Sequence, residues 1–331
     1  MSAGRTLVTG ASGFLGQHLC RALAARGAPV RALIRRGDMT LPGVETFRLA
    51  DLLDRAAHQT ALREVETVIH LAARVHVVSD QAADPWAEYR RTNVDGTRLL
   101  MEESLAAGVR RFVFFSTVKA LGESTDTPWT EQTHPAPTDP YGISKLEAEQ
   151  VVRELATAGG MAATVLRLPL VYGPGMKANM LRLFEVVDRG IPLPLGGVRN
   201  RRSLVFAGNV VAAVEGVLAT PAAAGETFFV SDGRDLSTPE LIRAIAGALG
   251  RPARLISVPP LLFRTAGRLG DLLAPLVRLP VSSAAVARLF GSLVVDSSKL
   301  ARVVGFRPPF SLDEGLRLTA EWYRRRATDQ R

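Results

Sequence analysis

The sequence contains a hydroxyl, a phenol and an ammonium group at a spacing that would let them transfer a proton together. Ser116 and Thr117 end a short apolar run, and the segment Tyr141-Gly142-Ile143-Ser144-Lys145 follows. A four-residue spacing places Tyr141 and Lys145 on one face of a helix. There the ammonium is expected to lower the pKa of the phenol, while the Thr117 hydroxyl holds a substrate oxygen. The pattern predicts Tyr141 as an acid/base, with Thr117 and Lys145 as its catalytic partners.

A glycine-rich turn near the N-terminus gives this proton relay its context. The apolar run Leu7-Val8 ends in a turn with G-x-x-G-x-x-G spacing, and a helical pattern follows at once. Glycines let the backbone approach a pyrophosphate, and the helix N-terminus offers free N–H groups. We interpret the turn as dinucleotide-binding, with an ordinary strand–helix turn as the alternative. Its candidate cofactor contacts are Gly10, Ser12, Gly13, Phe14, Leu15 and Gly16.

The end of the next apolar run, residues 30–34, indicates which dinucleotide is bound. An acidic residue at this position of a dinucleotide fold binds the ribose 2′-hydroxyl, whereas an arginine accommodates a 2′-phosphate. The residue here is Arg35, so NADP(H) is favoured over NAD(H), although arginine also stacks on adenine. Asp51 and Leu52 are candidates to cover the adenine edge, or they form a simple strand-end turn.

Strand and helix patterns alternate through about residue 170, which predicts an α/β fold with a parallel sheet covered on both faces. Expected strands are 30–34, 46–50, 68–72, 112–116 and 163–168, and expected helices are 17–26, 86–107 and 141–158. We predict a Rossmann-type doubly wound sheet in residues 1–170. After Pro169, Pro and Gly become frequent, and a mixed α/β substrate lobe is expected over 171–331. Capping boxes at Ser237/Glu240 and Ser311/Glu314 mark helix starts in that lobe.

Amino-acid composition and charge restrict the kind of ligand that this protein is expected to bind. The chain has 331 residues and a net charge of +9, from 41 Lys+Arg against 32 Asp+Glu, but the arginines are dispersed. This pattern favours a phosphorylated small molecule over a nucleic acid. The single cysteine, Cys20, supports neither a disulfide nor a metal cluster, so no metal is expected.

The sequence shows neither a secretory signal pattern nor an apolar run long enough to span a membrane. A cytoplasmic protein without membrane insertion is therefore expected. The segment 258–290 is rich in Leu, Pro and Arg, and its charged residues make an amphipathic helical surface the favoured interpretation. These charged residues are Arg264, Arg268, Asp271, Arg278 and Arg288.

Taken together, the motifs resemble the extended short-chain dehydrogenase/reductases of the NAD-dependent epimerase/dehydratase family, which act mainly on nucleotide sugars. The matching segments run along nearly the whole chain. They are 9–16, 70–73, His76-Val77, 93–97, 115–117, 139–145, 171–175, 202–206 with Asn209, and 305–308.

The resemblance implies roles for further residues. Lys145 also grips the nicotinamide ribose, and the backbone amides of Asn179-Met180 and the Arg202 side chain meet a nucleotide diphosphate. Arg288 is a second, loosely aligned arginine for that diphosphate, and Lys119 faces the sugar. The remaining candidate cofactor contacts are Leu71, Ala72, Ala73, Asn93, Ser116 and Pro169, and His76 is a further substrate candidate.

Three departures from the family pattern narrow the activity. Leu170 replaces a substrate-contacting Asn of many epimerases, and Arg35 replaces their acidic ribose-binding residue. Val118-Lys119 follow Thr117 in place of the Asp-Glu pair that 4,6-dehydration needs. The leading hypothesis is NAD(P)-dependent chemistry at C4 of a UDP-linked, N-acetylated hexose. Under this hypothesis, we expect the protein to act as a 4-keto-sugar reductase or a 4-epimerase in bacterial surface polysaccharide synthesis.

Two alternatives remain open, an NADP-dependent reductase of a non-nucleotide carbonyl compound and a dinucleotide-binding regulator without catalysis. A homodimer is expected by resemblance, through the helices at 86–107 and 141–158. Leu99, Leu100, Leu146 and Val151 supply the apolar face, unless they only pack on the chain's own sheet.

Overall fold

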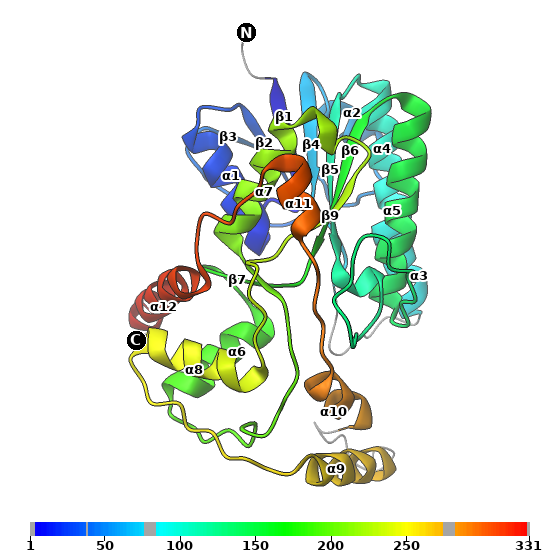
Figure 1. Ribbon diagram of the computed structural model, residues 1–331. Helices are drawn as coiled ribbons and strands as arrows, with labels where there is room; N and C mark the ends of the chain where they lie inside the picture. The colour runs from blue at the N-terminus through cyan, green and yellow to red at the C-terminus, as the bar shows by residue number, and fades with distance from the viewer. Residues whose placement is uncertain (1–3, 38, 76–83, 274–281, 330–331) are drawn as a thin grey trace.

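The computed structural model describes residues 4–37, 39–75, 84–273 and 282–329 (Figure 1). Within these residues, seven strands form one parallel sheet in the order β3-β2-β1-β4-β5-β6-β9. The bounds are β1 (Arg5–Thr9), β2 (Val30–Ile34), β3 (Val44–Arg48), β4 (Val65–His70), β5 (Arg111–Thr117), β6 (Ala162–Leu168) and β9 (Thr227–Phe229). The strand order reverses between β1 and β4, and such a switch point opens a crevice at the carboxyl ends of the strands.

Helices cover both faces of the sheet, as the sequence predicted. On one face, α1 (Phe14–Ala25) and α7 (Ala207–Ala219) contribute to a core cluster with β1, β2 and β6. On the other face, α2 (Arg55–Ala61), α4 (Gly96–Ala106) and α5 (Pro140–Gly159) form a second cluster with the same sheet. The doubly wound α/β fold is confirmed.

The helix expected over 86–107 is divided in the structure. It comprises α3 (Pro85–Arg90), a π-helical turn (Arg91–Asp95) and α4. A π turn inserted in a helix changes the direction of the side chains near it. Such turns are frequent at functional sites. Here the turn carries Thr92, which lines the cavity described below, and Asn93, which is buried.

A second group of elements lies below the sheet in Figure 1 and has its own core. It contains β7 (Leu170–Tyr172), β8 (Leu204–Phe206), α6 (Ala178–Asp188), α8 (Thr238–Leu249) and α12 (Leu312–Asp329). Both predicted capping boxes are present, at Ser237/Glu240 before α8 and at Ser311/Glu314 before α12.

Residues after 170 also return to the sheet. Strand β9 pairs with β6, and α7 and α11 (Ser298–Val304) pack in the core cluster that contains α1. Two short 3₁₀ helices are Val118–Ala120 and Pro221–Ala223. Helices α9 (Pro260–Leu273) and α10 (Ser283–Phe290) lie together at the end of the molecule far from the sheet (Figure 1). In the described part of the chain, no helix is long and apolar enough to cross a membrane.

Candidate active site

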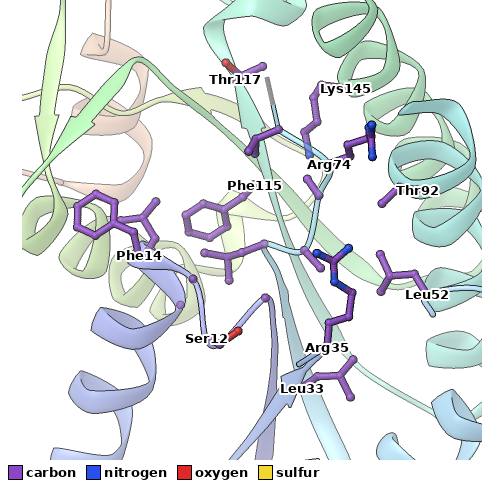
Figure 2. A pocket seen from close by; sticks show the side chains of 18 of the residues that line it. Ser12, Phe14, Leu33, Arg35, Leu52, Arg74, Thr92, Phe115, Thr117 and Lys145 are labelled. Carbon is purple, nitrogen blue, oxygen red and sulfur yellow. The ribbon is translucent and has the colours of Figure 1, made fainter. Parts of the chain in front are cut away.

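A cavity of about 870 Å³ lies at the carboxyl ends of the central strands. Figure 2 shows Leu33 and Arg35 at one end of it and Thr117 and Lys145 at the other. All the predicted cofactor contacts line this cavity except Asn93, and the three predicted catalytic residues line it as well. The lining also includes Arg74, Arg91, Thr92 and Lys177, which the sequence analysis did not select.

The glycine-rich turn has the geometry that a pyrophosphate requires. Gly10 adopts φ +65°, and its carbonyl accepts a hydrogen bond from the Gly13 N–H at 2.9 Å. A Cβ at Gly16 would lie 2.3 Å from the Gly10 carbonyl oxygen, so only glycine fits there. Within the described residues, no side chain caps the N-terminus of α1, which leaves its first N–H groups available to an anion. The turn therefore fits a dinucleotide.

A buried chain of hydrogen bonds fixes the strand end beside this turn. The Thr9 hydroxyl accepts from the N–H groups of Leu71 and Ala72 and lies 2.6 Å from His70 Nδ1. His70 Nε2 lies 3.0 Å from the Thr97 hydroxyl, which donates to the Asn93 carbonyl. Burial lowers the pKa of His70, so a neutral imidazole links the two hydroxyls. His70 is thus a buried structural residue, the interpretation that a lone histidine favours.

Asn93 lies behind the cavity wall. Its amide accepts from the N–H of Arg74 at 2.7 Å and donates to the Arg74 carbonyl at 3.0 Å. The same amide donates to the Ser144 hydroxyl, and that hydroxyl donates to the Tyr141 carbonyl. Asn93 therefore connects the strand end after β4 to the helix that carries Tyr141 and Lys145.

That helix, α5, begins where its sequence requires. The Asp139 carboxylate accepts from the Gly142 N–H at 2.8 Å, and Pro140 occupies the first helical position. This cap fixes Tyr141 in the first turn, with Lys145 one turn later. The hydrogen bonds and cationic partner of Asp139 lower the pKa of its carboxyl to about 2, so the cap remains charged near neutral pH.

The electrostatics of the catalytic side chains differ from the expectation. Burial raises the pKa of Tyr141 to about 12, and a hydrogen bond from the Thr117 hydroxyl only partly opposes this. Burial also lowers the pKa of Lys145 to about 7, with its Nζ 3.9 Å from the centre of the Phe114 ring. The predicted lowering of the phenol pKa by Lys145 is therefore not seen among these residues, because burial raises this pKa and the opposing hydrogen bond comes from Thr117, not from Lys145.

A buried carboxylate, that of Glu149, supports this site, and the sequence analysis did not identify it. Glu149 accepts from the Ser116 hydroxyl at 2.5 Å and from two guanidinium nitrogens of Arg167 at 3.0 and 2.7 Å. The Glu149 carboxylate also accepts a hydrogen bond from Arg153. Its charge acts to raise the pKa of Lys145, against the larger lowering by burial. The available signal was its position four residues after Lys145, on the same helix face. Ser116 thus turns away from substrate chemistry, whereas Thr117 is the hydroxyl beside Tyr141.

The residues predicted to bind the substrate, the two arginines among them, lie in different surroundings. Arg202 is half-buried, and its guanidinium donates to the carbonyls of Arg288 and Gly291. It has no carboxylate partner among the described residues, and burial lowers its pKa. The Arg288 side chain is exposed on α10, and its backbone carbonyl is what contacts Arg202. Arg202 is therefore a cation held by neutral carbonyls, available to an anionic ligand.

Other substrate candidates are placed differently. Lys119 forms ion pairs with Glu123 at 3.0 Å and Asp139 at 2.5 Å and does not line the cavity. Asn179 is exposed and Met180 is buried in the first turn of α6, whose N-terminus has no side-chain cap. Lys177, just before that helix, lines the cavity. His76 lies outside the described residues.

Comparison with known proteins agrees with this geometry. The model of the NAD dependent epimerase/dehydratase family matches residues 6–231. The chain belongs to this family. It is 36% identical to a UDP-glucose 4-epimerase of Vibrio cholerae, over 95% of this chain and 94% of the relative. It is 27% identical to an N-acetyl-α-D-glucosaminyl-diphospho-undecaprenol 4-epimerase of Escherichia coli O157:H7, over 96% and 94%.

Solved structures support the fold. UDP-glucose 4-epimerase of Thermotoga maritima, solved with UDP-glucose, superposes with a TM-score of 0.79 at 27% identity, covering 98% of this chain and 99% of that one. MoeE5 in complex with UDP-glucuronic acid and NAD gives a TM-score of 0.76 at 31% identity, covering 98% and 100%. The chain is an enzyme of the epimerase/dehydratase family.

Proposed function

We propose that this enzyme uses a nicotinamide dinucleotide to transform C4 of a UDP-linked hexose, as a 4-epimerase or a 4-keto-sugar reductase. The observation that carries the proposal is the position of Thr117, Tyr141 and Lys145 at one end of a cavity whose other wall is a glycine-rich turn. Relatives that act on, or are solved with, UDP-sugars support the substrate class. An N-acetylated sugar and a role in polysaccharide synthesis are the finer parts of this proposal.

The residues have distinct chemical roles in this scheme. A nicotinamide dinucleotide held in this cavity would supply or accept the hydride at C4. Tyr141 holds the proton of the C4 oxygen, and it gives that proton to the forming alkoxide or takes it from the hydroxyl. Thr117 donates a hydrogen bond to the same oxygen, and Lys145 would hold the nicotinamide ribose. Because the pKa of Tyr141 is about 12, the phenol is protonated and ready as an acid in the reductive direction.

Two cationic features suit the diphosphate of the substrate. Arg202 carries a half-buried positive charge that no described carboxylate neutralises. The N-terminus of α6 offers backbone N–H groups without a side-chain cap, next to the exposed Lys177. Both anion-binding devices suit a diphosphate better than a neutral carbonyl compound.

Arg35 supports NADP(H) as the cofactor. Its side chain lines the end of the cavity opposite Thr117 and Lys145 (Figure 2). Asp51, which lines the same end, forms an ion pair with Arg91. At least one cation, Arg35, is therefore available at this end of the cavity to bind the 2′-phosphate of NADP(H). Structural neighbours with NAD bound make NAD(H) the alternative that binding measurements must exclude.

One relative favours a second candidate function. A 2-alkyl-3-oxoalkanoate reductase of Stenotrophomonas maltophilia is 32% identical over 95% of this chain, and it reduces a substrate without a nucleotide. The same Thr117, Tyr141 and Lys145 would serve such a reductase. It differs in requiring no diphosphate site, so UDP is not expected to stabilise the protein.

Product analysis tests the proposal. The enzyme is incubated with UDP-hexoses and with UDP-4-keto sugars plus NAD(P)H, and products are separated and identified by NMR. A C4 isomer indicates the epimerase, and NAD(P)H consumption with a new C4 alcohol indicates the reductase. Assay of cofactor released on denaturation separates them further, because an epimerase recycles its dinucleotide in place. No conversion of either substrate class, together with no thermal shift from UDP, would overturn the proposal.

A further inference from the structure

The surface of α9 carries leucines that face solvent. Of the nine large apolar side chains that are exposed in the described residues, four belong to α9: Leu261, Leu262, Leu269 and Leu272, at 57–73% exposure. We call these four the leucine stripe. A fifth, Ile256, lies four residues before the helix and is 53% exposed.

These leucines are not the packing face of the helix. Helix α9 packs on α10 through Phe263, whose ring meets Phe290 edge-on at 5.4 Å, and through the buried Gly267, next to the Ser283 backbone. At about 100° per residue, the leucine stripe lies on the side opposite Phe263 and Gly267. Helix α9 is thus apolar on two sides, and only one side is covered within the described chain.

Basic residues border the stripe. Arg264 and Arg268 are exposed along one edge of it, and neither has a carboxylate partner among the described residues. Arg288 is exposed on α10. Asp271 is the acidic residue of the two helices, and its carboxylate accepts from the Ser283 N–H. A leucine face edged by arginines matches an anionic bilayer surface, whereas a second copy would bring like charges together.

We infer that α9 docks the enzyme on an anionic membrane surface, lying in the plane of the interface with the leucine stripe among the acyl chains. The helix has 14 residues, about 21 Å at 1.5 Å per residue, which is too short to cross a bilayer. Arg202 donates to the Arg288 and Gly291 carbonyls, so the C-terminal end of α10, the helix on which α9 packs, lies beside the arginine of the proposed diphosphate site.

Vesicle sedimentation tests this inference with the full chain. Vesicles of phosphatidylglycerol and phosphatidylethanolamine are compared with vesicles of phosphatidylcholine alone, at low and high salt. We expect the wild-type protein to sediment with the anionic vesicles and to be released by salt. Replacing the stripe (L261Q, L262Q, L269Q and L272Q) is expected to lower the bound fraction about tenfold or more. Glutamine keeps the helix propensity of leucine.

Matched variants separate docking from misfolding. L261Q with L272Q changes only the two most exposed leucines and is expected to give a partial loss. R264Q with R268Q should weaken binding to the anionic vesicles and reduce its salt dependence. Ile191→Gln, at an exposed apolar residue outside α9, should leave binding unchanged. Circular dichroism and turnover of a water-soluble substrate check folding, and their result is independent of the sedimentation result.

Two outcomes overturn the inference. The first is wild-type protein that stays in the supernatant with anionic vesicles. The second is a stripe variant that binds these vesicles as well as the wild type does. Light scattering adds a third check: if the stripe variant loses mass as an oligomer, the leucine stripe is a contact between copies and the inference is wrong.

Discussion

Two regions of the proposed site are built by different means. One is the cavity beside the glycine turn, called here the cofactor end. The other is the region of Arg202 and the N-terminus of α6, called here the substrate end, where Arg202 does not line the cavity. At the cofactor end, the glycine turn and the strand end after β4 are fixed by buried hydrogen bonds through Thr9, His70 and Asn93. At the substrate end, the partners of Arg202 among the described residues are backbone carbonyls, and no side chain in that part of the chain caps the N-terminus of α6. Both ends keep donors for an anion, but internal side-chain hydrogen bonds fix the shape of the first end, whereas at the second Arg202 has no carboxylate partner among the described residues. We expect loss of the catalytic residues at the first end to abolish activity, and changes at the second to alter substrate binding.

The largest effect is expected at the proton donor. Tyr141→Phe removes the acid/base and should lower kcat about a thousandfold, with cofactor affinity nearly unchanged. The measurement is steady-state turnover beside dinucleotide titration. Tyr323→Phe, in the last helix, is the control and should keep full activity. Turnover of the Tyr141 variant within tenfold of wild type would remove Tyr141 from the mechanism.

The buried carboxylate beneath the cofactor end comes next. Glu149→Gln leaves the Arg167 guanidinium buried without its charge partner, and this should cost about 3–5 kcal/mol of unfolding free energy. Urea unfolding measures the loss. Glu147→Gln is the control, because Glu147 is partly exposed and pairs with Arg90 at 3.5 Å. Equal stability of the two variants would mean that Glu149 does not stabilise the catalytic helix.

The lysine of the cofactor end should make stability depend on pH. Burial lowers the pKa of Lys145 from 10.5 to about 7, so between these values the unfolded chain binds a proton that the folded chain does not. The free energy of unfolding of the ligand-free protein should therefore rise with pH through this window. Lys145→Met should flatten that slope and stabilise the protein at pH 7, while abolishing turnover. An unchanged slope in the variant would exclude Lys145 as its source.

At the substrate end the expected effects are smaller and act on binding. Arg202→Met should raise KM for a UDP-sugar about 10- to 100-fold through loss of a charged hydrogen bond, with a smaller change in kcat. Arg201→Met is the matched control, because Arg201 is exposed and pairs with Asp235 at 3.0 Å. If the two variants share the wild-type KM, the diphosphate does not bind at Arg202.

The smallest effect concerns cofactor choice. Arg35→Asp should reduce the preference for NADPH over NADH about tenfold or more, because an acidic residue repels the 2′-phosphate and accepts from the 2′-hydroxyl. Titration of both reduced cofactors measures the ratio. Arg36→Asp is the control, since Arg36 does not line the cavity. A preference for NADH in the wild-type protein would contradict our interpretation of Arg35.

Local patterns predicted the fold and part of the lining of the cavity because each depended on short-range signals, whereas further lining residues such as Ala72 and Pro169 were expected from the family resemblance. The glycine turn, the buried strands and the capped start of α5 are all encoded within a few neighbouring residues. The sequence could not show that Asn93 supports the cavity wall from behind, or that Lys119 is paired with Asp139. Those facts depend on segments far apart in the chain. A lowered phenol pKa was predicted from Lys145, but burial raises the pKa of Tyr141, and burial depends on how distant segments pack.

The central claim is hydride transfer at sugar C4 with Tyr141 handling the proton, and deuterium at C4 tests it most directly. With wild-type enzyme, we expect label from deuterated NAD(P)H to appear at C4 of a reduced UDP-4-keto sugar, or label at C4 of a UDP-hexose to persist through inversion. Tyr141→Phe should do neither. A protein that binds the dinucleotide but leaves C4 without new label and without inversion in every UDP-sugar would contradict the account.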